Sequence, residues 1–166
     1  MSSFAPWVDL LTGAWKREHF DQELARVVQG AHWDASHLSL LWIDVDELEV
    51  HNDVHGRASV DAALAWLASR ISILLDGRGP IARLEGGAFG VYLPSTSREQ
   101  ALRLSEELRQ SVPRTLHSSA FGDYRLTVSV GVAVLRRSEP WGNFIDAAEY
   151  ACRCAKQGGR DAVVAR

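Results

Sequence analysis

Residues 81–93, IARLEGGAFGVYL, decide the fold of this 166-residue chain. Two apolar arms, 81–84 and 89–93, flank a Gly-Gly pair, and this pattern predicts a β-hairpin because glycine readily adopts the positive φ angles of a tight turn. A turn this bare of side chains also lets the phosphates of a ligand approach the main chain. These residues leave both interpretations open, although Gly-Gly is foremost a turn signal.

Helices and strands are expected on both sides of this hairpin. The continuous apolar run Leu38–Val45 predicts a central strand buried on both faces, with Asp44 near its end. Residues 57–76 repeat apolar side chains at helical spacing, and Ser97 suits the N-cap of a helix that continues to Val112. The other expected elements are a helix at 17–28, a polar loop at 30–36, one or two helical turns at 46–56, a hairpin with arms at 115–121 and 124–135 joined by Gly122-Asp123, a helix at 143–157 and a strand at 162–165.

This order of elements predicts an α+β fold. We expect an antiparallel-rich central sheet flanked by helices and built around a ferredoxin-like βαββαβ unit. A hydrophobic content of 46% with 23% charged residues is typical of a soluble globular protein, and residues 1–166 are expected to form a single domain.

Charge and cysteine content narrow the classes of function. A net charge of −3 gives no general reason to expect nucleic acid as a partner, because a phosphate-binding surface needs a basic excess. No apolar run approaches the ~20 residues that cross a bilayer, so we expect no membrane insertion and a cytoplasmic location. Cys152 and Cys154 project from different faces of a predicted helix, which favours packing roles over a disulfide bond.

Four further motifs resemble those of one protein family. The segments are DLLTGAWKREHF (9–20), IDVDELEVHNDVHG (43–56), TVSVGVA (127–133) and AKQGGRDAV (155–163). In order and spacing they resemble the GGDEF domain, the diguanylate cyclase fold. The resemblance implies a relationship to enzymes that join two GTP molecules into cyclic di-GMP, working as facing pairs that each present one GTP.

The hairpin departs from this family at its signature. The five signature positions read Glu85, Gly86, Gly87, Ala88 and Phe89, without either signature acid. In active members, the resemblance implies, two magnesium ions bridge the triphosphate to a carboxylate at the first strand's end, here Asp44, and to the third signature position, here Gly87. A magnesium site commonly uses only one or two carboxylates, so we expect loss of catalysis, no resident cofactor, and magnesium only if GTP binds.

The nucleotide-binding positions of the family are better retained. Asn52 and Asp61 resemble the residues that read the guanine edge, and Lys156 and Arg160 resemble the phosphate-binding pair. Plain structural roles stay open for all four. Asn52 could cap a turn, Asp61 could favour a helix N-terminus, and Lys156 and Arg160 could be solvated charges at a helix C-terminus.

Several other positions differ from the family pattern. Glu85 lies two residues before Gly87 and could offer a replacement metal ligand, but we favour the alternative that its charge repels a triphosphate. Glu49 stands where the family has lysine, and Arg57 stands where it has histidine. Each acidic change weakens the expected binding of GTP.

The family's product-inhibition motif, RxxD, is also missing. Its two end positions fall on Asp76 and Gly79. Arg78 and Arg83 are nearby, and either could stack on guanine. Without the motif, we do not expect cyclic di-GMP to bind tightly at that place.

Histidine and tryptophan residues suggest two weaker possibilities. His51 and His55 are four residues apart beside Asp53, which superficially resembles a pair of metal ligands on a helix, but without a third ligand we favour packing or solvated histidines. Three tryptophans in predicted loops could either pack locally or form a contact surface for a partner; these are Trp7, Trp33 and Trp141.

The sequence therefore predicts a degenerate GGDEF domain. Our first hypothesis is an inactive regulatory or protein-interaction module in cyclic di-GMP signalling, with an unidentified protein partner. The alternatives are a GTP-binding module that uses the remnant pocket, and a weak diguanylate cyclase.

Overall fold

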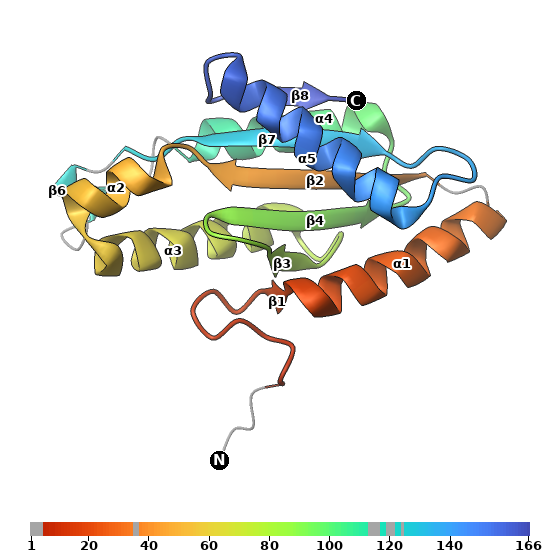
Figure 1. Ribbon diagram of the computed structural model, residues 1–166, viewed down its shortest axis with the longest axis horizontal. Helices are drawn as coiled ribbons and strands as arrows, with labels where there is room; N and C mark the ends of the chain where they lie inside the picture. Colours follow the sequence, from red (N-terminus) through yellow and green to blue (C-terminus); the bar gives the residue numbers. More distant parts are fainter. Residues whose placement is uncertain (1–4, 35–36, 113–116, 119–121, 124) are drawn as a thin grey trace.

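The computed structural model describes residues 5–34, 37–112, 117–118, 122–123 and 125–166. Within them the strands form a six-stranded sheet in the order β1-β3-β4-β2-β7-β8 and a two-stranded sheet, β5-β6 (Figure 1). The strands are β1 (Trp15–Lys16), β2 (Leu38–Val45), β3 (Ile81–Arg83), β4 (Ala88–Pro94), β5 (His117–Ser118), β6 (Gly122–Asp123), β7 (Val128–Val134) and β8 (Val163–Ala165). The helices are α1 (Arg17–Asp34), α2 (Leu48–His55), α3 (Arg57–Leu75), α4 (Arg98–Ser111) and α5 (Trp141–Gln157).

Strand β2 lies at the centre of the large sheet. It pairs antiparallel with β4 on one side and with β7 on the other. Strands β3 and β4 form the predicted hairpin, whereas β1 joins β3 and β8 joins β7 in parallel. The predicted α+β fold, with an antiparallel-rich sheet flanked by helices, is confirmed.

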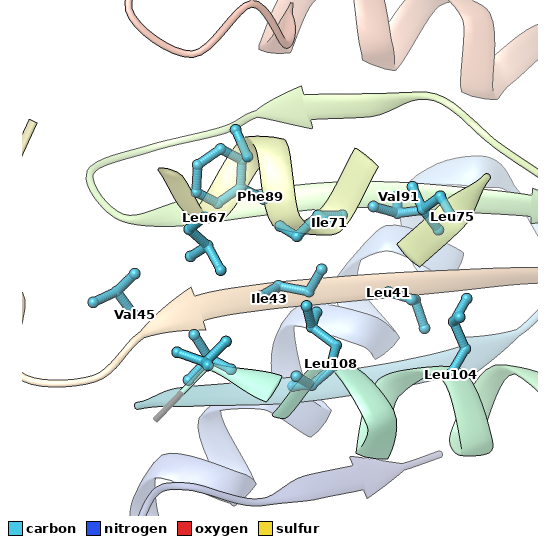
Figure 2. Packing of buried hydrophobic residues seen from close by; sticks show 14 of the residues in the cluster. Leu41, Ile43, Val45, Leu67, Ile71, Leu75, Phe89, Val91, Leu104 and Leu108 are labelled. Carbon is cyan, nitrogen blue, oxygen red and sulfur yellow. The ribbon is translucent and has the colours of Figure 1, made fainter. Parts of the chain in front are cut away.

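Helices cover both faces of this sheet (Figure 1). On one face α3 and α4 pack against Leu41, Ile43 and Val45 of β2, as Figure 2 shows. On the other face α1 and α5 share a second apolar cluster with Leu40 and Trp42. Successive residues of a strand point to opposite faces, so a strand covered on both sides needs an uninterrupted apolar sequence.

Helix α5 lies close to β7 at Gly131. A Cβ atom at this position would lie 2.0 Å from the carbonyl oxygen of Ala148 and 2.3 Å from the backbone nitrogen of Cys152. The Cys152 thiol is buried there and donates to the Ser129 carbonyl at 3.3 Å, and burial raises its pKa to about 12. Cys152 and Cys154 are both free, in agreement with the packing roles predicted for them.

The hairpin, the central strand and three helices follow the sequence-based predictions. Strand β2 has the predicted bounds, and α3 and α4 agree within a residue or two. The Ser97 hydroxyl accepts from the Gln100 amide nitrogen at 3.3 Å, while the Gln100 side chain accepts from the Ser97 nitrogen at 2.8 Å. This reciprocal pair confirms Ser97 as the N-cap of α4.

Two predicted segments were wrong. Helix α1 continues to Asp34 through the stretch expected to be a loop, because Gly30 costs an exposed helix only about 1 kcal/mol and Ala31 is buried. Gly122-Asp123 forms β6 and pairs with β5, rather than forming the turn of the second hairpin. The rest of that hairpin falls partly on residues 115–116, 119–121 and 124, which lie outside the described residues, as do 35–36 of the expected loop.

Helix α3 qualifies the expectation about membrane spans. Among the described residues it is the one helix long and apolar enough to cross a bilayer by length and composition alone. Seven of its residues are buried, however, and they pack against the sheet as in the core helix of a globular domain. Leu75 takes the buried place predicted for Leu74, which is half-buried.

Candidate functional site

The candidate site lies at the end of the sheet where β2 finishes, at the left of Figure 1. Helix α2, the β3–β4 turn and the C-terminal end of α5 meet there. In the β2–β4 register Asp44 lies opposite Ala88, and the Val45 nitrogen donates to the Gly87 carbonyl at 3.2 Å. The predicted strand-end carboxylate and the signature positions are therefore neighbours.

Asp44 forms an ion pair with Lys156. The ammonium nitrogen lies 2.7 Å from Oδ2 of Asp44 and also donates to the Val45 carbonyl at 3.3 Å. Burial raises the pKa of Asp44, Lys156 lowers it, and the Asp46 carboxylate raises it again, so that the net shift is upward. A half-buried carboxylate of this kind depends on a cation beside it, and here Lys156 supplies that cation.

The signature turn is closed by its own backbone. The Ala88 nitrogen donates to the Glu85 carbonyl at 2.8 Å, and Gly86 has a φ of 53°, as the Gly-Gly pattern predicts. Glu85 is exposed and lies within this turn, beyond the end of β3. The strand alternation that would bring its carboxylate to the face of Gly87 therefore does not apply.

The third signature position is packed against apolar side chains. A Cβ atom on Gly87 would lie 3.1 Å from Cδ2 of Leu48 and 3.1 Å from Cβ of Val45. Ala88 at the fourth position is buried in the cluster shared with α1 and α5. Apolar side chains thus lie against position 87, and position 88 is buried in an apolar cluster opposite Asp44.

A cavity of about 460 Å³ lies beside this turn. Both Asn52 of α2 and Asp61 of α3 line it. Asn52 is in the middle of its helix and Asp61 lies beyond the first turn of α3, so neither caps a helix end. The cavity is lined by Leu48, Asn52, Arg57, Val60, Asp61, Leu64, Arg83 and Gly86.

Arg57 and Arg83 make the cavity partly cationic. The Arg83 guanidinium donates to the Gly86 carbonyl at 3.3 Å and lies 3.5 Å from Oδ1 of Asp9. Asp9 also accepts from the Thr12 nitrogen at 2.9 Å. Through Asp9 and the Gly86 carbonyl, Arg83 therefore links the N-terminal motif to the signature turn.

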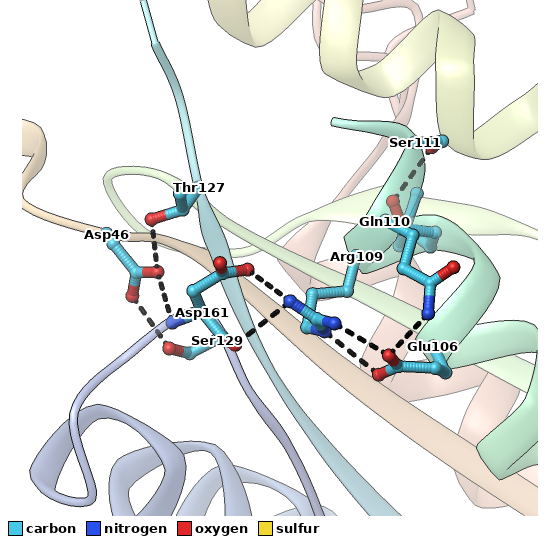
Figure 3. A network of polar contacts seen from close by, with 9 residues as sticks. Asp46, Glu106, Arg109, Gln110, Ser111, Thr127, Ser129 and Asp161 are labelled. Carbon is cyan, nitrogen blue, oxygen red and sulfur yellow. Dashed lines mark hydrogen bonds and ion pairs between the residues drawn. The ribbon is translucent and has the colours of Figure 1, made fainter. Parts of the chain in front are cut away.

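Sequence reasoning missed the role of Asp46. Its carboxylate is 2% exposed and accepts from Ser129 at 2.7 Å, from Thr127 at 2.8 Å and from the backbone nitrogen of Asp161 at 3.0 Å (Figure 3). Polar residues at alternate positions of TVSVGVA were the available signal. Asp46 ties the end of β2 to β7 and to the turn after α5, which carries Arg160.

Lys156 and Arg160 differ in their surroundings. Lys156 is half-buried and bonded to β2, so it is not a solvated charge at a helix end. Arg160 is exposed and has a φ of 65°, in the turn between α5 and β8. Of the predicted phosphate-binding pair, Lys156 is therefore already paired with Asp44, whereas Arg160 is exposed to solvent.

The two end positions of the product-inhibition motif do not suit an arginine and an aspartate. Asp76 is the exposed C-cap of α3, with a φ of 46°. A Cβ atom on Gly79 would lie 2.1 Å from the Tyr92 carbonyl oxygen, so an aspartate does not fit there without backbone movement. The Arg78 guanidinium donates to the carbonyls of Leu75 at 3.1 Å and Leu74 at 3.4 Å.

The histidine and tryptophan hypotheses gain little. The rings of His51 and His55 are stacked with centroids 6.2 Å apart, and burial together with His55 lowers the pKa of His51. The described residues contain no group of three or more side chains able to hold a metal ion. Trp141 begins α5 and Trp33 belongs to α1, so neither is in a loop, and the side chain of Trp33 lies outside what the structure describes. Trp7 packs on His19, with ring centroids 5.4 Å apart.

Curated relatives match nearly the whole chain. An uncharacterized protein of Bacillus subtilis (strain 168), YhcK, is 30% identical over 96% of this chain and 45% of its own length. An uncharacterized membrane protein of Staphylococcus aureus (strain USA300) is 29% identical over 94% of this chain and 45% of its own. The chain therefore spans less than half the length of these relatives.

Solved structures match the fold closely. The GGDEF domain of DgcB from Caulobacter crescentus, in complex with c-di-GMP, has a TM-score of 0.93 and 27% identity, covering 99% of this chain and 96% of that domain. Diguanylate cyclase SiaD from Pseudomonas aeruginosa, in complex with its activator SiaC, has a TM-score of 0.91 and 28% identity, covering 98% and 62%.

The match to a family model extends over most of the chain. Residues 6–162 fit the family described as diguanylate cyclase, GGDEF domain. This range includes the first three motifs, all but the last residue of the fourth, and the altered signature turn. The chain therefore belongs to the GGDEF domain family of cyclic di-GMP signalling.

Proposed function

We propose that this GGDEF domain is catalytically inactive and acts as a regulatory or protein-interaction module. The observation that carries the proposal is the set of side chains at the end of β2 and in the signature turn. Asp44 is bonded to Lys156, while Gly87 and Ala88 offer no oxygen ligand from their side chains. A reaction that needs two magnesium ions lacks most of its ligands in this set.

The donor set does not fit a pair of magnesium ions. Magnesium requires near-octahedral oxygen coordination, and among the described residues no group of three or more side chains could hold a metal ion. Of the carboxylates near this strand end, Asp44 is paired with Lys156 and Asp46 is held by Thr127, Ser129 and the Asp161 nitrogen. A divalent ion on Asp44 would also lie close to the Lys156 ammonium. At about 4 Å and an effective dielectric constant of about 20, that repulsion amounts to roughly 8 kcal/mol.

The comparisons support a regulatory setting. SiaD was solved with its activator protein, and DgcB with c-di-GMP, so proteins of this fold do engage such partners. Because the chain covers less than half of its curated relatives, we propose that its partner is either a separate protein or another part of a longer chain. We expect a cytoplasmic location, where cyclic di-GMP signalling has its GTP.

A product assay tests the proposed inactivity. Purified domain is incubated with GTP and magnesium chloride, and cyclic di-GMP is measured by chromatography beside an active GGDEF domain. We expect no product above that of a protein-free control. Multiple turnovers would instead establish the second of the two alternatives, a weak cyclase.

The partner is sought by affinity capture from the native cell, followed by a titration of the purified partner onto the domain. We expect a complex that forms equally well with and without magnesium. Loss of that complex on chelation of magnesium would contradict a role independent of the catalytic ions.

The second candidate function is binding of a guanine nucleotide in the remnant pocket. It is favoured by the 460 Å³ cavity that holds Asn52 and Asp61, an amide and a carboxylate able to pair with the donors and acceptors of guanine. A nucleotide bound there would stabilise one conformation of the signature turn for a partner to recognise. Isothermal titration of GTP onto the domain tests it, and a flat trace removes it.

A further inference from the structure

We propose that the Lys156 ammonium takes the place of a divalent cation in this domain, so that a guanine nucleotide binds without magnesium. The inference rests on the second candidate function, nucleotide binding in the remnant pocket. It goes further by placing the Lys156 ammonium where a metal ion would lie and by predicting that chelation of magnesium does not weaken binding.

The first step is the position of Lys156. Its Nζ atom bridges Oδ2 of Asp44 at 2.7 Å and the Val45 carbonyl at 3.3 Å, two oxygens at the end of β2. A cation that bridges a carboxylate and a main-chain carbonyl occupies the kind of place that a bound metal ion takes at a strand end. Lys156 therefore neutralises Asp44 from within the chain.

The second step is the backbone link between Lys156 and the signature turn beside the cavity. Val45 accepts from Lys156 through its carbonyl oxygen, and its backbone nitrogen donates to the Gly87 carbonyl at 3.2 Å. Gly86, the preceding residue of the turn, lines the cavity. Lys156 does not itself line the cavity, and the single residue Val45 links its ammonium to the turn beside which a nucleotide would lie.

The third step is the charge that remains. Arg57 and Arg83 line the cavity, and Arg160 is exposed in the turn after α5. A triphosphate entering this end of the molecule meets these cations directly, while Glu85 and Glu49 oppose it. The Lys156 ammonium has three donors and two known acceptors, so it can also donate to a phosphate oxygen, which competes with Asp44 as a strong acceptor.

The test is isothermal titration of GTP in two buffers, one with magnesium chloride and one with a chelator. We expect the wild-type dissociation constant to differ by less than about twofold between them. Asp44→Asn should bind GTP more tightly in the chelator, because it removes the carboxylate that competes for Lys156. Lys156→Gln should bind at least about tenfold more weakly.

Matched variants separate charge from folding. Arg153→Gln removes a positive charge from the same helix at an exposed place, and it should bind GTP like the wild type. Lys156→Arg keeps the charge and should restore most of the binding lost in Lys156→Gln. Thermal unfolding of each variant shows whether it is folded during the titration.

The outcomes distinguish the two proposals. Binding that requires magnesium, or that Asp44→Asn abolishes, overturns the inference but confirms the nucleotide pocket. Flat titrations of the wild type and Asp44→Asn in both buffers overturn the inference and the pocket together. Neither result alters the expected absence of cyclic di-GMP synthesis, which the product assay measures separately.

Discussion

Arg109 of α4 and Asp161 of the α5–β8 turn form an ion pair of 2.7 Å between Nη1 and Oδ1, although 52 residues separate them in sequence (Figure 3). The same guanidinium holds Glu106 at 2.6 Å and 2.9 Å. From the other side, the Asp161 nitrogen donates to Asp46. Arg160 and Asp161 have φ angles of 65° and 43°, so charged contacts hold a left-handed turn that non-glycine residues rarely adopt.

Arg109→Ala should therefore destabilise the domain by about 1–3 kcal/mol, because it removes several charge-assisted hydrogen bonds and leaves the turn unsupported. Urea unfolding measures the difference. Arg153→Ala is the control, since it breaks an exposed pair with Glu149 on α5 and should change stability by less than about 0.5 kcal/mol. Equal losses in the two variants would show that the link from α4 to the turn has no special weight.

The Glu106 carboxylate should make stability depend on pH in the acid range. Hydrogen bonds from Arg109 lower the pKa of Glu106 from its ordinary 4.5 to about 2, with Gln110 contributing and burial opposing. A group whose folded pKa is lowered stabilises the native state fully above its unfolded pKa. This contribution is lost as the pH falls from about 4.5 towards 2.

Glu106→Gln should accordingly flatten the fall in unfolding free energy between these two pH values, as urea unfolding across the range would measure. Arg109→Ala should flatten it as well, because it removes the partner that lowers the pKa. Curves for Glu106→Gln and the wild type that stay parallel from pH 4.5 to 2 would disprove this origin.

The sheet and its two-sided core were predictable because local pattern and tertiary environment agree there. Leu38–Val45 is apolar throughout, and β2 is indeed covered on both faces. The Gly-Gly turn and the Ser97 cap were legible for a similar reason, since each is set by contacts within four residues. Asp44 at the strand end follows directly from the length of the apolar run.

The polar contacts of the site were not predictable in this way. Asp46 looks like its neighbour Asp44 in the sequence, yet it is buried under Thr127 and Ser129, residues that come 81 and 83 positions later. The Lys156–Asp44 pair joins α5 to β2, and α5 is placed by its close contact with Gly131 of the neighbouring strand β7. The predicted helix at 17–28 was too short because Gly30 is a local signal for a helix end. Tertiary burial of Ala31 outweighs that signal, and α1 continues to Asp34.

Restoring acids to the signature should not restore the enzyme. In Gly87→Asp/Ala88→Glu, the new Cβ atom at position 87 would lie 3.1 Å from side-chain atoms of Leu48 and Val45. Lys156 would still be paired with Asp44. We expect no more than about 1% of the cyclic di-GMP production of an active GGDEF domain, a difference of at least about 2.7 kcal/mol in activation free energy. Chromatography of reactions with GTP and magnesium measures it. Robust turnover would mean that the turn and Lys156 adapt once the ligands are present.

Gly131→Ala should be among the most damaging conservative changes in the chain. Its methyl group would meet main-chain atoms of Ala148 and Cys152 at 2.0 and 2.3 Å, so α5 must move away from β7. Backbone cannot yield as a side chain does, and we expect a loss of at least about 3 kcal/mol, a large part of a total near 5–15 kcal/mol. Thermal and urea unfolding give the value.

Gly30→Ala is the matched control. Gly30 is exposed on α1, and an added methyl group there meets nothing within 4 Å. This variant should stabilise the domain by about 0.5–1 kcal/mol. Near-equal stabilities of the two variants would show that α5 packs more loosely on β7 than these contacts require.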